Sequence, residues 1–202
     1  MKRKVSFILI FFLTSIGSIA QSQSESPYKE YIKRSIYLSL KIVDSPKIQR
    51  QWTAQNVEIL ATVLDAIETH MDLSHKKMLS TILTESEMNI YALGGPNRNG
   101  SYDYGLTQQT STYLWARYAA AKKKLKALGI PYTNSKFDIA VNVMAGAIVL
   151  KEFRSELVHR GVTNPYAHFV AYNVGPGGYF MSRMYYKKTA YLRRFKSFFV
   201  RL

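Results

Sequence analysis

Three short blocks of the sequence carry side chains that could do chemistry on a sugar chain. In order, they are Glu85-Ser86-Glu87-Met88-Asn89, Gly105-Leu106-Thr107-Gln108 and Ala171-Tyr172-Asn173-Val174-Gly175. Together they supply a carboxyl group, several amides and a phenol. A carboxyl group can protonate the oxygen of a glycosidic bond, while amides and phenols can hydrogen-bond the hydroxyl and acetamido groups of a glycan. The three blocks therefore predict an enzyme that breaks bonds between sugars.

Glu85 is the candidate acid. Ile82 and Leu83 come just before it on an apolar helix, so its carboxyl group is expected to be partly buried. Burial disfavours the charged carboxylate and raises its pKa, as a general acid at neutral pH requires. Glu87 is the rival, but two residues along a helix are about 200° apart around its axis, so only one of the two glutamates can face a given groove. The alternative for either is a solvated surface glutamate.

The blocks resemble the motifs of lytic transglycosylases of the soluble, goose-lysozyme-like class. In that family they read Glu-Ser-x-Phe-Asn, Gly-Leu-Met-Gln and Ala-Tyr-Asn-Ala-Gly. A further family helix, Asn-x-x-x-Gly-x-x-x-Leu, is matched by Asn142, Gly146 and Leu150. The similarity runs over roughly residues 72–176, about half of the chain. It implies a mainly α, lysozyme-like helical domain with a substrate groove and a short loop or ribbon.

The resemblance also implies a reaction. Glu85 would be the catalytic acid and then the base in cleavage of the bond between N-acetylmuramic acid and N-acetylglucosamine. The sugar's own C6 hydroxyl would replace water and leave a 1,6-anhydro end, without a metal or cofactor. No second carboxylate is required, because the 2-acetamido group can stabilise the positive centre, as in substrate-assisted glycosidases.

Six residues are the predicted substrate-binding set: Ser86, Asn89, Gly105, Gln108, Tyr172 and Asn173. Tyr172 is expected to hydrogen-bond Glu85 and hold its rotamer. Gln108 and Asn173 are expected to bond the glycan, and Gly105 to let the backbone approach a sugar closely. Structural alternatives stay open, with Tyr172 a core aromatic, Asn173 a helix cap and Gly105 a turn residue.

The second block departs from the family pattern. Thr107 replaces the usual methionine at a position expected to pack against substrate, and Gln109 replaces a common aliphatic residue. These departures keep a second class of function open, a weakly active wall-binding assembly factor. Asp103 is the nearby candidate for a second carboxylate. Were it to activate water, the enzyme would be a hydrolytic lysozyme-type muramidase; its alternative role is to brace the loop through backbone N–H groups.

The segment 97–103 resembles the Asn-Gly-Ser-x-Asp stretch of specialised transglycosylases that serve secretion, conjugation or pilus machines. Such machinery is therefore a possible partner, beside the glycan strands of peptidoglycan.

Helices are the predicted elements throughout, because apolar residues recur at helical spacing. Their expected ranges are 28–43, 55–71, 75–89, 113–128, 137–159 and 165–173. Ser74 is a good N-cap for the third of these. The segment 94–105 is expected to be a loop with a short ribbon, and 175–178 a turn.

The first residues have the order of a secretory signal peptide. Lys2, Arg3 and Lys4 precede an apolar run over 5–16, and small residues end it at Ala20. Cleavage after Ala20 and export to the periplasm or cell envelope are predicted. An uncleaved N-terminal anchor is the alternative, although the run is shorter than the roughly 20 residues of a membrane span.

The chain of 202 residues has 28 lysines and arginines against 13 acidic residues, a net charge of +15. Such a charge favours a polyanionic partner. Nucleic acid is disfavoured because of the export signal, whereas cell walls and membrane surfaces are anionic. There is no cysteine, so disulfides are excluded. The four histidines show no metal-ligand spacing; they are His70, His75, His159 and His168.

The expected organisation has four parts. Residues 1–20 are the signal peptide, 21–70 a helical extension packed on the catalytic domain, 71–180 the catalytic domain, and 181–202 a basic aromatic helix. On that last helix an apolar stripe is formed by Tyr191, Phe195, Phe198 and Leu202. Packing of the stripe on the domain is the first interpretation. A peripheral membrane or wall contact and docking to a secretion-machine subunit are the alternatives.

Overall fold

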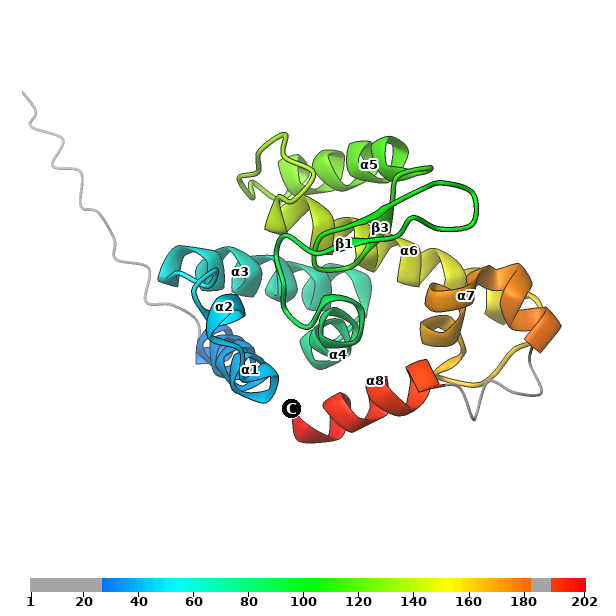
Figure 1. The fold of residues 1–202 in the computed structure, drawn as a ribbon, viewed down its shortest axis with the longest axis horizontal. Coiled ribbons are helices and arrows are strands. Elements are labelled where there is room, and N and C mark those ends of the chain that lie inside the picture. Colours follow the sequence, from blue (N-terminus) through cyan, green and yellow to red (C-terminus); the bar gives the residue numbers. More distant parts are fainter. Residues whose placement is uncertain (1–26, 183–189) are drawn as a thin grey trace, which may run out of the picture.

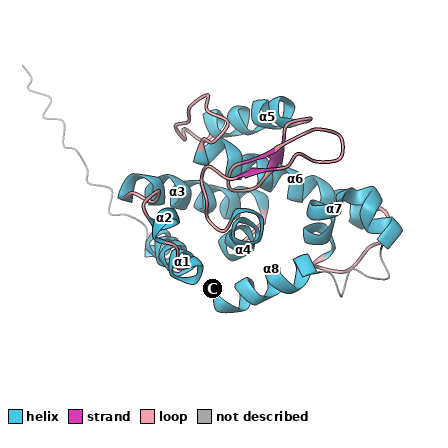
Figure 2. Ribbon diagram, in the orientation of Figure 1, coloured by secondary structure: helices cyan, strands magenta, loops and turns pink. Residues whose placement is uncertain are grey.

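The structure is a computed structural model that describes residues 27–182 and 190–202. The predicted signal peptide over 1–20 lies outside the described residues. The described chain is mainly helical with one small antiparallel sheet, as the sequence predicts (Figure 2). The helices are α1 Pro27–Val43, α2 Pro46–Gln49, α3 Ala54–Met71, α4 His75–Ser86, α5 Leu114–Ala127, α6 Ile139–His159, α7 Ala167–Ser182 and α8 Ala190–Arg201.

Helix α6 runs through the middle of the fold, with α3, α5 and α7 packed against it (Figure 1). Its first half is almost uniformly apolar, and every residue from Ile139 to Ala147 is buried. A helix that is apolar on all sides is stable only when neighbours surround it. Asp138 caps its start by accepting a hydrogen bond from the backbone N–H of Val141.

Helices α1 and α3 pack into the same hydrophobic core as the other helices. Ile36 of α1 and Leu60 of α3, for example, belong to the same buried apolar cluster. Helix α1 packs on both α3 and α4. The predicted extension over 21–70 therefore contacts the helix that carries Glu85.

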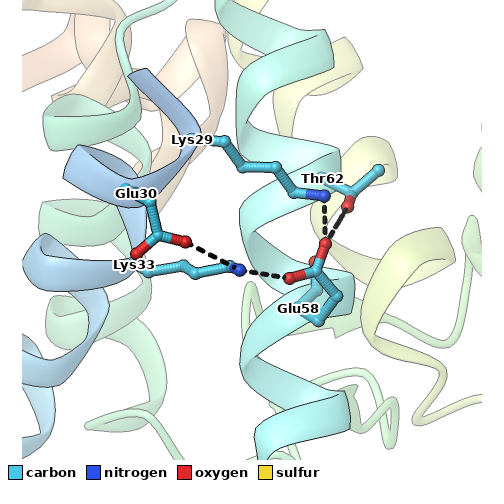
Figure 3. Close-up of polar contacts among 5 residues, drawn as sticks. All are labelled: Lys29, Glu30, Lys33, Glu58 and Thr62. Atoms are coloured by element: carbon cyan, nitrogen blue, oxygen red, sulfur yellow. Dashed lines mark hydrogen bonds and ion pairs between the residues drawn. The ribbon is translucent and has the colours of Figure 1, made fainter. Parts of the chain in front are cut away.

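A polar network also joins α1 to α3 (Figure 3). Glu58 of α3 forms ion pairs with Lys29 and, at 2.6 Å, with Lys33 of α1. Lys33 also contacts Glu30 at 3.0 Å. The Thr62 hydroxyl donates to the backbone carbonyl of Glu58 at 2.9 Å. Burial alone would raise the pKa of Glu58, but hydrogen bonds and charge from the two ammonium groups hold it below its usual value.

Helix α4 is shorter than the sequence predicts. Ser74 is its N-cap, as expected, and accepts a hydrogen bond from the backbone N–H of Lys77. The expected end at residue 89 is wrong, because the helix ends at Ser86. Glu87 and Met88 adopt left-handed backbone angles, with φ of 52° and 63°. This conformation stops the helical hydrogen bonding and turns the chain away.

Helix α7 is two helical segments joined at a break. Gly175, with φ of 74° and ψ of 159°, is not helical, and Pro176 follows it. The predicted turn is right at Gly175, but the chain resumes a helix up to Ser182 instead of turning over 175–178. Glycine adopts a positive φ without steric cost, and proline is suited to the first turn of the helix that follows.

A three-stranded antiparallel sheet lies in the loop region between α4 and α5. Its strands are β1 Leu93–Gly94, β2 Asp103–Tyr104 and β3 Gln109–Thr110, in that order. Leu93 pairs with Tyr104, and Tyr104 pairs with Gln109. The predicted short ribbon is confirmed. The third strand, which directly follows the second sequence block, was not predicted.

Helix α8 packs on α4 and α7. Leu192 and Phe195 are buried, and the ring of Phe195 stacks on Phe169 of α7 with centroids 4.2 Å apart. The apolar stripe formed by Tyr191, Phe195, Phe198 and Leu202 therefore packs against the domain. In the part of the chain that the structure describes, no helix has the length and apolar character needed to cross a membrane.

Candidate active site

A cleft of about 1100 Å³ opens on the side of the domain where the ribbon, α5, α6 and α7 meet the end of α4. Its lining residues come from the loop 97–103, strand β3, helices α5 and α6, and the part of α7 around its break at Gly175. Glu85 is the residue that α4 contributes.

Glu85 lies in the last turn of α4 and is partly buried, and the residues before it on the helix, Ile82 and Leu83, are completely buried. Burial raises the pKa of the Glu85 carboxyl group to about 7; a hydrogen bond from Tyr191 opposes this rise, the charge of Asp103 adds to it, and the charge of Arg194 opposes it. A carboxylic acid with such a pKa is protonated in a large fraction of molecules at neutral pH, which suits it to act as a general acid.

The hydrogen bond to Glu85 comes from α8. The hydroxyl of Tyr191 donates to Glu85 Oε1 at 2.7 Å. Burial, together with the Glu85 charge, raises the pKa of Tyr191 well above its usual value, so this phenol stays a neutral donor. The sequence interpretation missed Tyr191 because it assigned the ring to the packing stripe of the C-terminal helix.

Tyr172 does not have the role that was predicted for it. Its hydroxyl donates to the backbone carbonyl of Thr107 at 2.6 Å and accepts from Gln109 Nε2 at 2.6 Å. The expected bond to Glu85 is therefore wrong, since the hydroxyl bonds Thr107 and Gln109 instead. Tyr172 still lines the cleft with Glu85.

Glu87 lies outside the cleft. It is exposed, occupies the left-handed position that ends α4, and forms an ion pair with Arg194 of α8. That only one of the two glutamates faces the groove agrees with the sequence interpretation. The reason is not the one expected from helix geometry. Glu87 lies outside the cleft because the helix ends before it, and not because it points to another side of the helix.

The six predicted substrate-binding residues divide equally. Gln108, Tyr172 and Asn173 line the cleft. Ser86 and Asn89 are not among its lining residues. The Ser86 hydroxyl donates to the backbone carbonyl of Ile82 at 3.0 Å, and Asn89 Oδ1 accepts from the next turn's backbone, at Tyr91, at 3.1 Å. Both side chains thus bond backbone groups at or just after the end of α4, as short polar side chains commonly do.

Gly105 was expected to let the backbone approach a sugar, but it lies against the side chain of Asn142 instead. Its φ is 74°, and a Cβ at this position would lie 2.5 Å from Nδ2 of Asn142 in α6. A glycine is thus required by the backbone conformation and by the close approach of Asn142. Gly105 is not among the residues that line the cleft.

Thr107 is completely buried and faces α6, so the expectation that it packs against substrate is wrong. Its backbone N–H donates to Asn142 Oδ1 at 2.8 Å and its hydroxyl to the Asn142 carbonyl at 2.9 Å. A Cβ on Gly146 would lie 2.8 Å from the Thr107 side chain. Asn142 and Gly146 are one helical turn apart on α6, so both face Thr107.

Gln109 was noted in the sequence only as a departure from a family pattern, yet it is part of the site. It is 1% exposed and borders the cleft. Its Nε2 bonds the Tyr172 hydroxyl at 2.6 Å and the Thr107 carbonyl at 3.2 Å. An aliphatic residue could not make these bonds, and nothing in the sequence alone indicated that Tyr172 would lie beside it.

Asp103 also borders the cleft. Its Oδ2 accepts a hydrogen bond from the Asn97 side chain at 3.1 Å, across the loop that joins β1 to β2. The bracing role expected for Asp103 is thus seen with a side-chain donor. Its charge is one of the causes that raise the Glu85 pKa.

None of the four histidines, all within the described residues, lines the cleft that Glu85 borders. His75 Nδ1 is 2.6 Å from the Glu68 carboxylate. Burial lowers the pKa of His168 to about 4, helped by the charges of Lys77 and Arg154. Within residues 27–182 and 190–202, no group of three or more potential ligands could hold a metal ion.

No protein-family model matches the chain, and it has no significant match to a curated protein or to a solved structure. The site's geometry and the sequence motifs therefore carry the functional argument.

Proposed function

We propose that the protein is a peptidoglycan lytic transglycosylase with a lysozyme-like fold. The observation that carries this proposal is the Glu85 carboxyl group, which is partly buried at the edge of a large cleft with its pKa raised to about 7. The match of four ordered sequence blocks to that family's motifs supports it.

In the proposed reaction Glu85 begins protonated and donates its proton to the oxygen of the bond between N-acetylmuramic acid and N-acetylglucosamine. The bond to C1 breaks, and the 2-acetamido group stabilises the positive charge that develops there. Glu85, now ionised, takes the proton of the muramic acid C6 hydroxyl. The C6 oxygen closes on C1, so the products are a 1,6-anhydro end and a free 4-hydroxyl, and Glu85 is protonated again.

The surrounding residues would position the acid and the glycan. Tyr191 would fix the rotamer of Glu85 and stabilise its ionised form between the two proton transfers. Gln108 and Asn173 would bond acetamido and hydroxyl groups in the cleft. Tyr172 and Gln109 would keep the wall opposite Glu85 in place.

The cellular setting belongs to the same proposal. Export to the periplasm or cell envelope would bring the chain, with a charge of +12 once the three basic residues of the signal peptide are removed from +15, to an anionic wall. A secretion or conjugation apparatus that needs gaps in the wall is the proposed user. The basic face of α8 is the candidate surface for a wall or membrane contact, since much of its apolar stripe is turned inward.

A second candidate is a hydrolytic muramidase, and Asp103 favours it. This carboxylate borders the same cleft as Glu85 and could activate a water molecule. The two reactions differ in product, because hydrolysis leaves a reducing end at the muramic acid.

Digestion of purified wall sacculi, followed by mass spectrometry of the soluble fragments, tests the proposal. Wild type is expected to release 1,6-anhydromuropeptides, Glu85→Gln to release none, and the matched control Glu87→Gln to behave like wild type. Fragments with reducing ends would support the muramidase. Sacculus binding without fragments, in wild type as in Glu85→Gln, would favour the wall-binding assembly factor and refute both enzymes.

A further inference from the structure

Two cations border the cleft, and neither forms an ion pair within the described parts of the chain; one of them is exposed and the other, Arg117, is partly buried. The basic side chains that border the cleft, among the residues described, are Arg98 on the loop before β2 and Arg117 on α5. Four carboxylates border the same cleft: Glu85, Asp103, Glu152 and Glu156. None of these carboxylates forms an ion pair with Arg117 within the described parts of the chain.

Two contacts hold the Arg117 side chain. Its guanidinium lies over the ring of Tyr113, one helical turn earlier, with its carbon 5.2 Å from the ring centroid. Its Nη1 donates a long hydrogen bond of 3.4 Å to Gln109 Oε1. A guanidinium stacked on an aromatic ring is held in orientation at little entropic cost. The orientation of Arg117 is therefore preset by its neighbours.

Most of the N–H donors of the Arg117 guanidinium form no hydrogen bond with the described residues. A guanidinium has five N–H donors, and the described structure uses one of them, in the bond to Gln109. Arg117 is also partly buried, so water does not fully solvate its charge. A planar cation with spare parallel donors is the arrangement that binds a carboxylate through two hydrogen bonds.

We propose that Arg117, stacked on Tyr113, is a subsite for a carboxylate of the substrate. This inference rests on the proposed function and names the part of the peptidoglycan strand that the cleft selects. The surrounding acidic residues repel a negatively charged ligand, so a carboxylate is accepted in this cleft only where a cation meets it. An uncharged chitin-type glycan would not use the subsite.

A peptidoglycan strand offers carboxylates from two sources. The lactyl group of N-acetylmuramic acid ends in a free carboxylate when the stem peptide has been removed. When the peptide is present, that carboxyl is an amide, and the carboxylates belong to the peptide. Both sources present the same group to Arg117, and ligands that carry one or the other distinguish them.

The experiment measures binding of three tetrasaccharides by titration calorimetry. The first carries free lactyl carboxylates, the second carries stem peptides on the lactyl groups, and the third is chitotetraose, which has no carboxylate. The full chain is used in the Glu85→Gln form, so that no ligand is consumed. Arg117→Met and Arg117→Lys are each added to this form. Lys123→Met is the matched control. It also removes one positive charge, but Lys123 is exposed on the same helix and does not line the cleft.

Arg117→Met is expected to weaken binding of at least one carboxylate ligand by about tenfold to a hundredfold, the range for a hydrogen bond to a charged group. Chitotetraose binding should stay unchanged, and Arg117→Lys should restore part of the loss. A loss confined to the first ligand assigns the lactyl carboxylate, and a loss confined to the second assigns the peptide. Lys123→Met should leave all three affinities unaltered.

Two results would overturn the inference. One is that Arg117→Met leaves both carboxylate ligands bound as before. The other is an equal loss for chitotetraose, which would mean that Arg117 acts only by supporting Gln109 and Tyr172. The binding assay does not depend on catalysis, so failure of the proposed function would appear separately, as absence of 1,6-anhydro products from wild type.

Discussion

Tyr191 donates a 2.7 Å hydrogen bond to Glu85 across 106 positions of the sequence. The bond joins the last described helix to the end of α4. It favours the ionised carboxylate, while burial of Glu85 favours the neutral acid. The opposition of these two effects leaves the Glu85 pKa near the pH at which a proton can be both given and taken back.

The pH dependence of the proposed reaction follows from the Glu85 pKa of about 7. Glu85 must start protonated, so kcat/KM should decrease as the pH rises through about 7. The measurement is the initial rate of fragment release from sacculi between pH 5 and 9, at limiting substrate. A rate that rises through this range instead would mean that Glu85 acts first as a base.

Tyr191→Phe removes a hydrogen bond to the charged form of Glu85, so the Glu85 pKa should increase. The descending limb of the pH profile is expected to move to higher pH. The rate on its plateau should fall by about tenfold, because a charge-assisted bond contributes roughly 1.5–3 kcal/mol. Tyr37→Phe, at an exposed position of α1, is the control and should match wild type. An unmoved limb would show that the bond to Tyr191 does not tune the acid.

Asp103→Asn should shift the same limb in the opposite direction. The charge of Asp103 raises the Glu85 pKa, and its removal lowers that pKa. Activity should persist, with the limb at lower pH, and the products should remain 1,6-anhydro fragments. Complete loss of activity in Asp103→Asn, together with reducing ends in the wild-type products, would establish Asp103 as the second carboxylate of a muramidase.

Thr107→Val tests the buried junction with α6. The substitution keeps the shape of the side chain but removes the hydroxyl that donates to the Asn142 carbonyl. A buried acceptor that loses its donor costs about 1–3 kcal/mol, so the free energy of unfolding should decrease by that amount. Urea unfolding followed by circular dichroism measures it, with the exposed Thr112→Val as control. A purely catalytic defect at unchanged stability would contradict the buried position of Thr107.

Acid should weaken the connection between α1 and α3. The Glu58 pKa in the folded state lies below its usual value of 4.5. Its contribution to stability is therefore present above about that value and disappears as the pH falls through the lower folded-state pKa. Glu58→Gln should reduce the urea midpoint at pH 7 and have a smaller effect at pH 3. An equal reduction at both pH values would argue against the ion pairs with Lys29 and Lys33.

The helices, and the position of Glu85 at a buried helix end, could be predicted from the sequence because both depend on local spacing. Apolar periodicity located α3 and α6 to within a few residues, and the residues before Glu85 indicated a buried helix end. The partners of Glu85 and Tyr172 could not be predicted. They come from segments distant in the sequence, and only the packing of α8 on α4 brings Tyr191 into reach.

The errors at Gly105 and Thr107 have one physical origin. The motif to which these residues belong borders the cleft, but its backbone turns, so that its side chains point in different directions. Gln108 and Gln109 reach the cleft, whereas Gly105 and Thr107 meet Asn142. A sequence pattern indicates which segment lies near the site and does not tell which of its side chains face it.

Asn142 fills its hydrogen-bonding capacity within the protein. Its Nδ2 donates to the Tyr104 carbonyl at 2.8 Å and to the Tyr118 hydroxyl at 2.9 Å, while its Oδ1 accepts from Thr107. Gly105 and Gly146 leave the space that this arrangement needs. Saturation mutagenesis should therefore tolerate few substitutions at positions 105 and 146, where any side chain would collide with Asn142 or Thr107, and many more at neighbouring residues that line the cleft.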